Sequence, residues 1–160
     1  MEGKPGPMAS DQVKRKLAAI LAADIAGYSR LMGADEAGTL ARLKEYRREL
    51  IDPKTKQYRG RVVKTTGDGI LIEFPSVVDA VSGAIDVQQG MRQRNADVPP
   101  EKRIEFRIGV NLGDVIIDGR DLYGDGVNIA ARLEGVSRAG RHLHIPDRTQ
   151  SRARQNRLRC

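Results

Sequence analysis

Two short β-rich runs joined by a glycine–aspartate turn constrain the fold of this chain most strongly. Residues 61–66 and 70–74 are rich in β-branched and aromatic side chains, and Gly67-Asp68-Gly69 lies between them. An Asp-Gly pair between two such runs is typical of a β-hairpin. The segments before and after this hairpin then decide the fold class.

The spacing of apolar residues predicts the remaining elements. The apolar run over 17–23 has the length of a buried strand, although its alanines favour a helix by propensity. In chain order we expect a strand over 17–23, a helix over 35–51, the hairpin, a helix capped by Ser76, strands over 104–110 and 114–118, and a helix over 127–135. The order β-α-β-β-α-β predicts an α+β fold, a ferredoxin-like βαββαβ sandwich whose antiparallel sheet has helices on one face.

Prolines and glycines set the expected boundaries of these elements. Pro53 is expected just beyond the end of the helix over 35–51, because proline ends helices. Gly113 is expected to separate the two strands that flank it. Residues 121–126, which are rich in glycine and aspartate, are expected to form a loop.

The positive charge of the chain is concentrated at its C-terminal end. The net charge is +7, but residues 141–160 contain six arginines and one aspartate, a net of +5. The rest of the domain therefore carries only +2, and aromatic residues make up only 4%. Nucleic acid is an unfavourable partner, because the basic signal belongs to the tail and few rings are available to stack on bases.

The composition also bounds the compartment and the domain count. A single cysteine cannot form an internal disulfide, and the apolar run over 17–23 is too short to span a bilayer. We therefore expect one cytoplasmic domain over 16–140. Residues 1–15 are expected to be disordered, and residues 141–160 are interpreted as an aberrant basic tail.

Two aspartates stand at element boundaries, where side chains can converge. Asp24 ends the first apolar run, and Asp68 lies at the tip of the hairpin. If the first strand lies near the hairpin, both carboxylates face one space, which suits Mg²⁺ or Mn²⁺, and Gly27 and its neighbours could turn backbone N–H groups toward a phosphate. The alternatives are structural: Asp24 as a helix cap and Asp68 as a turn residue.

Three further polar residues are candidates with equally plain alternatives. Lys64 precedes Asp68 by four residues, so strand alternation would place both on one face. Asn128 and Arg132 are four residues apart on an expected helix and share a side of it. Taken singly, these residues are also explained as a solvated lysine and a polar helix surface.

Three segments in chain order together resemble the motifs of class III nucleotidyl cyclases. Residues 24–29 (Asp-Ile-Ala-Gly-Tyr-Ser) are similar to the first metal motif of that family, and residues 64–69 (Lys-Thr-Thr-Gly-Asp-Gly) to the second. Residues 121–133, which include Asp121, Asn128 and Arg132, resemble the segment that stabilises the transition state. The resemblance runs from about 17 to 140 and implies the cyclase homology domain fold, lacking its last strands.

The resemblance implies a role for each residue near the first two motifs. Asp24 and Asp68, assisted by the carbonyl of Ile25, would hold two Mg²⁺ or Mn²⁺ ions. Three consecutive residues would contact the triphosphate: Gly27, Tyr28 and Ser29. Lys64 would bind the purine base.

The third motif completes the implied site. Asp121 would read the purine together with Lys64, and a Lys/Asp pair at these positions implies adenine rather than guanine. Asn128 would orient the ribose and Arg132 would stabilise the pentavalent phosphorus. The family places its site at a dimer interface, so the expected partners are ATP and a second copy of the chain, which would supply Asn128 and Arg132.

Two departures from the family pattern favour an alternative function. No match is found for a late lysine that binds phosphate, and Asp114 stands where several members carry a basic phosphate contact. A frameshift after Gly140 is one hypothesis for the tail, since codons exist that would restore a family-like strand when read one base later. The expected function is an adenylate cyclase. The alternative is a truncated, inactive module that binds nucleotide or dimerises.

Overall fold

The computed structural model describes residues 14–118, 121–124, 127–128, 130 and 143–144. A six-stranded sheet has the strand order β2-β3-β1-β4-β5, and β6 pairs in parallel with β4. The strands are β1 (Lys14–Ile25), β2 (Arg61–Thr65), β3 (Gly69–Phe74), β4 (Phe106–Asp118), β5 (Asp121–Tyr123) and β6 (Leu143–His144). All other strand pairs are antiparallel.

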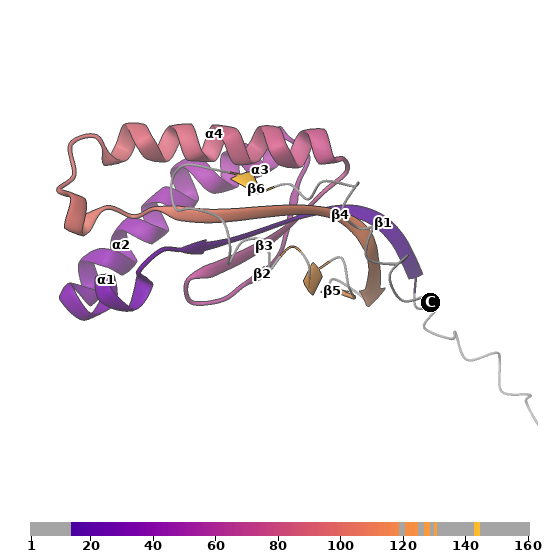
Figure 1. The fold of residues 1–160 in the computed structure, drawn as a ribbon, viewed down its shortest axis with the longest axis horizontal. Coiled ribbons are helices and arrows are strands. Elements are labelled where there is room, and N and C mark those ends of the chain that lie inside the picture. The colour runs from indigo at the N-terminus through magenta and orange to yellow at the C-terminus, as the bar shows by residue number, and fades with distance from the viewer. Residues whose placement is uncertain (1–13, 119–120, 125–126, 129, 131–142, 145–160) are drawn as a thin grey trace, which may run out of the picture.

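The helices gather over one face of this sheet, which we call the helix face (Figure 1). They are α1 (Tyr28–Ala34), α2 (Glu36–Tyr46), the π-helical turn η1 (Arg47–Ile51), α3 (Asp52–Gln57), α4 (Val77–Asn95) and the short 3₁₀ helix η2 (Pro100–Lys102). The expected β-α-β-β-α-β order, the antiparallel hairpin and the α+β class are confirmed. Most of the helix expected over 127–135 lies outside the described residues.

Alternation along β1 explains how one central strand supports two cores. Leu21 and Ile25 point to the helix face and pack in the larger apolar cluster with α4. Ile20 and Ala22 point to the opposite face and pack in a smaller cluster with Leu122 of β5. Because β1 is buried on both faces, it reads in the sequence as a continuous apolar run.

Helix α4 is fixed at its start and along its length by polar groups. The hydroxyl of Ser76 accepts a hydrogen bond from the Asp79 N–H at 3.1 Å, so the expected cap is confirmed. The buried amides of Gln88 and Asn95 donate to the backbone carbonyls of Phe106 and Ile104 at 3.0 and 2.9 Å. These amides satisfy one carbonyl at the start of β4 and one just before it, while the apolar residues of α4 pack on the sheet.

The helix expected over 35–51 differs from the observed one at both ends. Asp35 caps α2 through the Gly38 N–H at 3.0 Å, and the helical path continues through η1 into α3. The prediction that Pro53 lies beyond the helix end is wrong, since Pro53 occupies the first turn of α3. The wider turn of η1 precedes it, and proline is tolerated in a first turn because it needs no donor there.

Two other boundary predictions are also wrong. Gly113 does not break the strand, because β4 runs unbroken opposite β1 from Phe106 to Ile117. Residues 121–123 form strand β5 instead of a loop. Lys14 and Arg15, from the segment expected to be disordered, belong to β1, and Leu143–His144, from the segment interpreted as a tail, form β6. The rest of 1–15 and of 141–160 lies outside the described residues.

Within the described part of the chain, no helix combines the length and the apolar character needed to cross a membrane.

Candidate active site

The two candidate carboxylates come from neighbouring strands at one end of the sheet. Asp24 on β1 pairs directly with Gly69, the first residue of β3 and the residue after Asp68. Directly opposed residues in an antiparallel pair have Cα atoms about 5 Å apart. The predicted neighbourhood of the first strand and the hairpin is therefore confirmed, and both aspartates lie at the same sheet end.

Thr66 closes the hairpin turn that carries Asp68. The Thr66 N–H donates to the Gly69 carbonyl at 2.8 Å, and the Thr66 hydroxyl accepts from the Gly69 N–H at 3.1 Å. The expectation that Lys64 and Asp68 share one face of a strand is wrong. Asp68 lies in this turn and not on β2, so strand alternation does not relate the two residues. A bulge between Val62 and Lys64 also breaks the simple alternation.

Lys64 nevertheless shares a face with Asp24. It pairs with Leu71, which packs in the smaller cluster on the opposite face, and cross-strand partners project to the same side. Asp24 alternates onto this face behind Ile20 and Ala22. The Lys64 side chain is exposed and lies on the hairpin that also carries Asp68.

The chain after Asp24 turns sharply into α1. The Ala26 N–H donates to the Glu105 carbonyl at 2.9 Å, and Gly27 takes the left-handed conformation with φ +66°. Gly27 is the N-cap of α1 and receives no side-chain cap, so the alternative in which Asp24 caps this helix does not hold.

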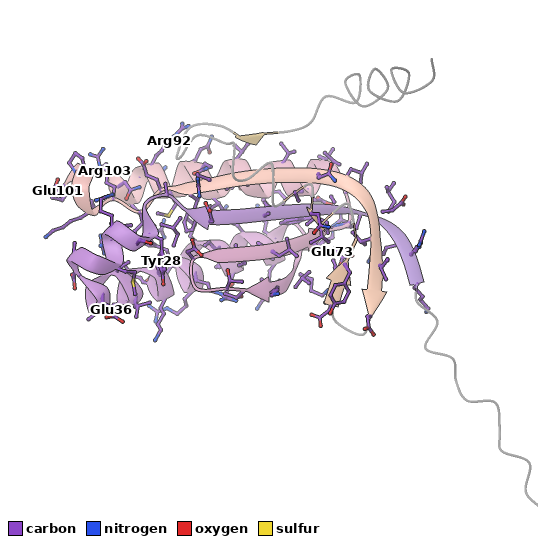
Figure 2. All side chains as sticks on the ribbon, turned by 60° about the horizontal axis from the view of Figure 1, so that its bottom comes forward. Tyr28, Glu36, Glu73, Arg92, Glu101 and Arg103 are labelled. Atoms are coloured by element: carbon purple, nitrogen blue, oxygen red, sulfur yellow. The ribbon has the colours of Figure 1, made fainter. Side chains whose placement is uncertain are left out.

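Tyr28 links this turn to the hairpin. A Cβ built on Gly67 would lie 3.5 Å from the Tyr28 hydroxyl, so the phenol lies against the turn that carries Asp68. Figure 2 shows Tyr28 at the hairpin-tip end of the sheet. Ser29 follows in α1 with an exposed side chain. Tyr28 therefore stands beside the turn that carries Asp68, and Gly27 lies in the turn that follows Asp24.

The structure adds one charged residue that the sequence analysis missed. Arg107 pairs with Asp24 across β1 and β4, and its Nε and Nη2 donate to the two carboxylate oxygens at 2.7 and 2.5 Å. The signal in the sequence was a lone arginine between Phe106 and Ile108, which both point to the helix face. Strand alternation places Arg107 on the opposite face, beside Asp24.

The third motif lies at the far end of the same sheet. Asp121 pairs with Asp118 where β5 meets the end of β4, and Asn128 is exposed on a helical segment after it. The negative charge of Asp121 raises the pKa of Tyr123, whose hydroxyl lies 3.5 Å from that carboxylate. Arg132 lies outside the described residues.

Asp24 and Asp121 are thus not brought together within one chain. Their strand partners on β4, Arg107 and Asp118, are separated by roughly 36 Å of extended strand. Figure 1 shows β4 bending at its Asp118 end, and β5 there contacts β2. One chain therefore presents the metal-type residues and Asn128 at separate places.

Oxygen donors dominate the end of the sheet that carries Asp24. The carboxylates of Asp24 and Asp68 and the backbone carbonyl of Ile25 are hard ligands, which are the kind that Mg²⁺ and Mn²⁺ prefer. Among the described residues, no group of three or more acidic, histidine or cysteine side chains could hold a metal. The donor chemistry fits a divalent ion held by two carboxylates with a carbonyl and further oxygens from substrate or water.

A different carboxylate on the same sheet is fully engaged in ion pairs. Glu73 on β3 is buried and bonds to Lys16 of β1 and, at 2.9 Å, to Arg61 of β2. Burial raises the pKa of Glu73, but the hydrogen bonds from Lys16 and Arg61 outweigh it and hold the pKa below its ordinary value. Glu73 is a structural anion, whereas Asp24 lies beside the hairpin turn that carries Asp68.

Solved structures resemble this fold over most of its length. A crystal structure of an adenylate/guanylate cyclase/hydrolase from Silicibacter pomeroyi matches with a TM-score of 0.80 and 47% identity, over 92% of this chain and 85% of that chain. The catalytic core of a rhodopsin-guanylyl cyclase with converted specificity, in complex with ATPαS, matches with a TM-score of 0.70 and 28% identity, over 88% of this chain and 83% of that chain.

Sequence comparisons agree with the structural ones. The Rhizobium meliloti (strain 1021) protein named "Putative adenylate cyclase 3" is 49% identical over 133 residues, which are 83% of this chain and 23% of that protein. The chain thus spans about a quarter of the length of this relative. The family model of the adenylate and guanylate cyclase catalytic domain matches residues 11–160 of this chain. With this match over nearly the whole chain, the protein belongs to the family of adenylate and guanylate cyclase catalytic domains.

Proposed function

We propose that this domain is an adenylate cyclase, which converts ATP to 3′,5′-cyclic AMP and pyrophosphate. The observation that carries the proposal is the direct pairing of Asp24 with Gly69, which brings two carboxylates to one sheet end next to a glycine turn. The choice of adenine is supported by the Lys64 and Asp121 pair at the purine positions and by the name of the Rhizobium meliloti relative.

Asp24, Asp68 and the Ile25 carbonyl would hold two Mg²⁺ or Mn²⁺ ions. Bound there, the ions would lower the pKa of the ribose 3′-hydroxyl and neutralise charge on the phosphates. Gly27 lies in the turn after Asp24, and Tyr28 lies against the turn that carries Asp68. Together with Ser29, they would position the triphosphate.

The remaining residues would orient the nucleoside for in-line attack. The 3′-oxygen forms a bond to the α-phosphorus, and the bond from that phosphorus to the pyrophosphate leaving group breaks. Asn128 would align the ribose and Arg132 would stabilise the charge on the equatorial oxygens. Lys64 and Asp121 would hold the adenine edge by hydrogen bonds.

A homodimer would unite the two groups of residues. The separation of Asp24 from Asp121 along β4 supports this, because two antiparallel copies could place the carboxylate end of one against Asn128 of the other. Such an arrangement would give two sites per dimer.

The test is cyclic nucleotide production by the purified chain with Mn²⁺, in which ATP and GTP are offered separately. We expect cyclic AMP from ATP, and loss of product in Asp68→Ala. A matched control is Asp97→Ala, an exposed carboxylate after α4 that carries no role in the site. Cyclic GMP as the main product would contradict the choice of adenine but would still support a nucleotidyl cyclase activity.

A second candidate is a catalytically inactive module that binds nucleotide. It is favoured by Asp114, which stands exposed on β4 where a basic phosphate contact is expected. Binding of ATP by a folded dimer without any product would support this function and exclude the first.

A further inference from the structure

Asp24 is held by a guanidinium at the place where the proposed function needs a metal ligand. Both of its oxygens accept from Arg107, at 2.7 and 2.5 Å, in the two-point geometry that gives strong charge-assisted bonds. The side chain of Asp24 is only 17% exposed and that of Arg107 is 33% exposed. A carboxylate this enclosed is costly to leave without a positive partner.

We propose that Arg107 is the resident counter-ion of Asp24, and that a divalent cation binds by exchanging with its guanidinium. This inference rests on the metal-binding role proposed above for Asp24. Arg107 would stabilise the metal-free domain and would also weaken its affinity for the ion. It is a positioning residue, because it acts through Asp24 and not on the substrate.

The position of the pair along the strands favours exchange over a permanent bridge. Asp24 lies opposite Gly69, so the hairpin turn with Asp68 borders it on one side while Arg107 borders it on the other. A cation entering from the hairpin side meets a second carboxylate there. Once the guanidinium has moved away, the two carboxylates carry a charge of −2, which a divalent ion would neutralise.

The ion pair at Glu73 provides the contrast. Glu73 is bonded by two cations, Lys16 on one oxygen and Arg61 on the other. It lies toward the other end of the sheet from Tyr28 (Figure 2), opposite Ile20 on β1. With one positive charge more than negative in that cluster, there is no electrostatic gain in exchanging either partner for a metal.

The test measures Mn²⁺ binding by electron paramagnetic resonance of the free ion, without nucleotide. Arg107→Gln is expected to bind Mn²⁺ roughly fivefold more tightly than the wild type, and Arg107→Lys to lie between them. Arg61→Gln is the matched control, since it removes the same charge from the ion pair with Glu73. That pair lies about four strand residues, or roughly 13 Å, from Asp24. The Mn²⁺ affinity of Arg61→Gln is expected to equal that of the wild type.

A second readout uses thermal unfolding. Without metal, Arg107→Gln should unfold at a lower temperature than the wild type, and saturating Mn²⁺ should raise its melting temperature by more than that of the wild type. Equal or weaker Mn²⁺ binding by folded Arg107→Gln and Arg107→Lys would overturn the inference. Absence of binding in all variants would overturn it as well, because the freed carboxylate would then not be a ligand.

These readouts separate the inference from the proposed function. If the Mn²⁺ affinities follow the expected order but no cyclic nucleotide forms, the inference stands and the function falls. If cyclic AMP forms while the Arg107 variants bind Mn²⁺ as the wild type does, the function stands and the inference falls.

Discussion

The two faces of the sheet use the same strands for different purposes. On the helix face, Leu21, Ile72 and Ile108 pack with α4 into a continuous apolar core. On the opposite face, the alternate positions carry Asp24 and Arg107 as a charged pair at one end of the smaller apolar cluster. One residue of alternation thus separates a position that stabilises the fold from a position that is available for chemistry.

A charge on these buried strands is found at the strand end or where neighbouring cations compensate it. Asp24 and Arg107 lie at the strand end, where the sheet meets the hairpin turn and α1, while Ile20, four residues back along β1 on the same face, is fully buried. Glu73 is the exception in the middle, and two cations from neighbouring strands compensate it. The predictions below test whether the two faces can be altered independently.

The largest effect is expected from the opposite face, on activity alone. Asp24→Asn keeps the shape of the side chain and an oxygen that can accept from Arg107, but it removes the charge that would bind a metal. We expect the rate of cyclic AMP formation to fall by about 10² to 10³-fold. Circular dichroism should show an unchanged fold. Activity near that of the wild type would contradict the assignment of Asp24.

On the helix face, we expect the reverse result. Met91 on α4 is 2% exposed in the larger cluster, and Met91→Ala should lower the free energy of unfolding by about 2–5 kcal/mol. Activity per folded molecule should remain. A urea titration measures the first quantity, and a rate normalised to the folded fraction measures the second. A normalised rate reduced as much as in Asp24→Asn would show that the two faces cannot be altered independently.

A smaller effect is expected from the side-chain amide of α4 that bonds to the backbone just before β4. Asn95→Ala removes the donor to the Ile104 carbonyl and should lower the free energy of unfolding by about 1–3 kcal/mol. Gln89→Ala on the exposed side of the same helix is the matched control and should change it by less than about 0.5 kcal/mol. Equal losses in the two variants would show that the amide bond adds nothing beyond helix propensity.

The smallest effect is a pH dependence from Glu73. Its pKa is lower in the folded protein, so its stabilising contribution is present above the ordinary glutamate pKa and is lost as the pH falls through the folded value. Glu73→Gln should therefore be less stable than the wild type at pH 7, by about 1 kcal/mol, and equally stable in acid. Chemical unfolding at several pH values measures this, and a constant difference across them would contradict the ion-pair account.

The sequence predicted the helix face better than the opposite face, and the reason is physical. Apolar periodicity reports burial and predicts the elements that pack on this face, such as α4, while the Asp-Gly turn predicts the hairpin and Ser76 predicts the start of α4. Strand ends depend on pairing, and Gly113 stays in β4 because Ala18 of β1 pairs with it. Local sequence could not show that partner.

Candidate site residues that belong to a local motif were predicted from the sequence. Arg107, which joins them only through the register of the strands, was missed. Asp24 and Asp68 were found as boundary carboxylates, and their neighbourhood is confirmed by pairing. Arg107 is distant in sequence from Asp24, and only the alignment of β1 with β4 brings the two together. The roles proposed for all the candidate site residues, including Asp24 and Asp68, stay predictions.

The central claim is that the two ends of the sheet supply opposite halves of one site. The direct test mixes Asp24→Ala chains with Asn128→Ala chains, each inactive alone, under conditions that let dimers exchange. Random pairing makes half of the dimers mixed, each with one intact site, so we expect about a quarter of the wild-type cyclic AMP activity. No recovered activity in a mixture shown to contain mixed dimers would contradict the claim.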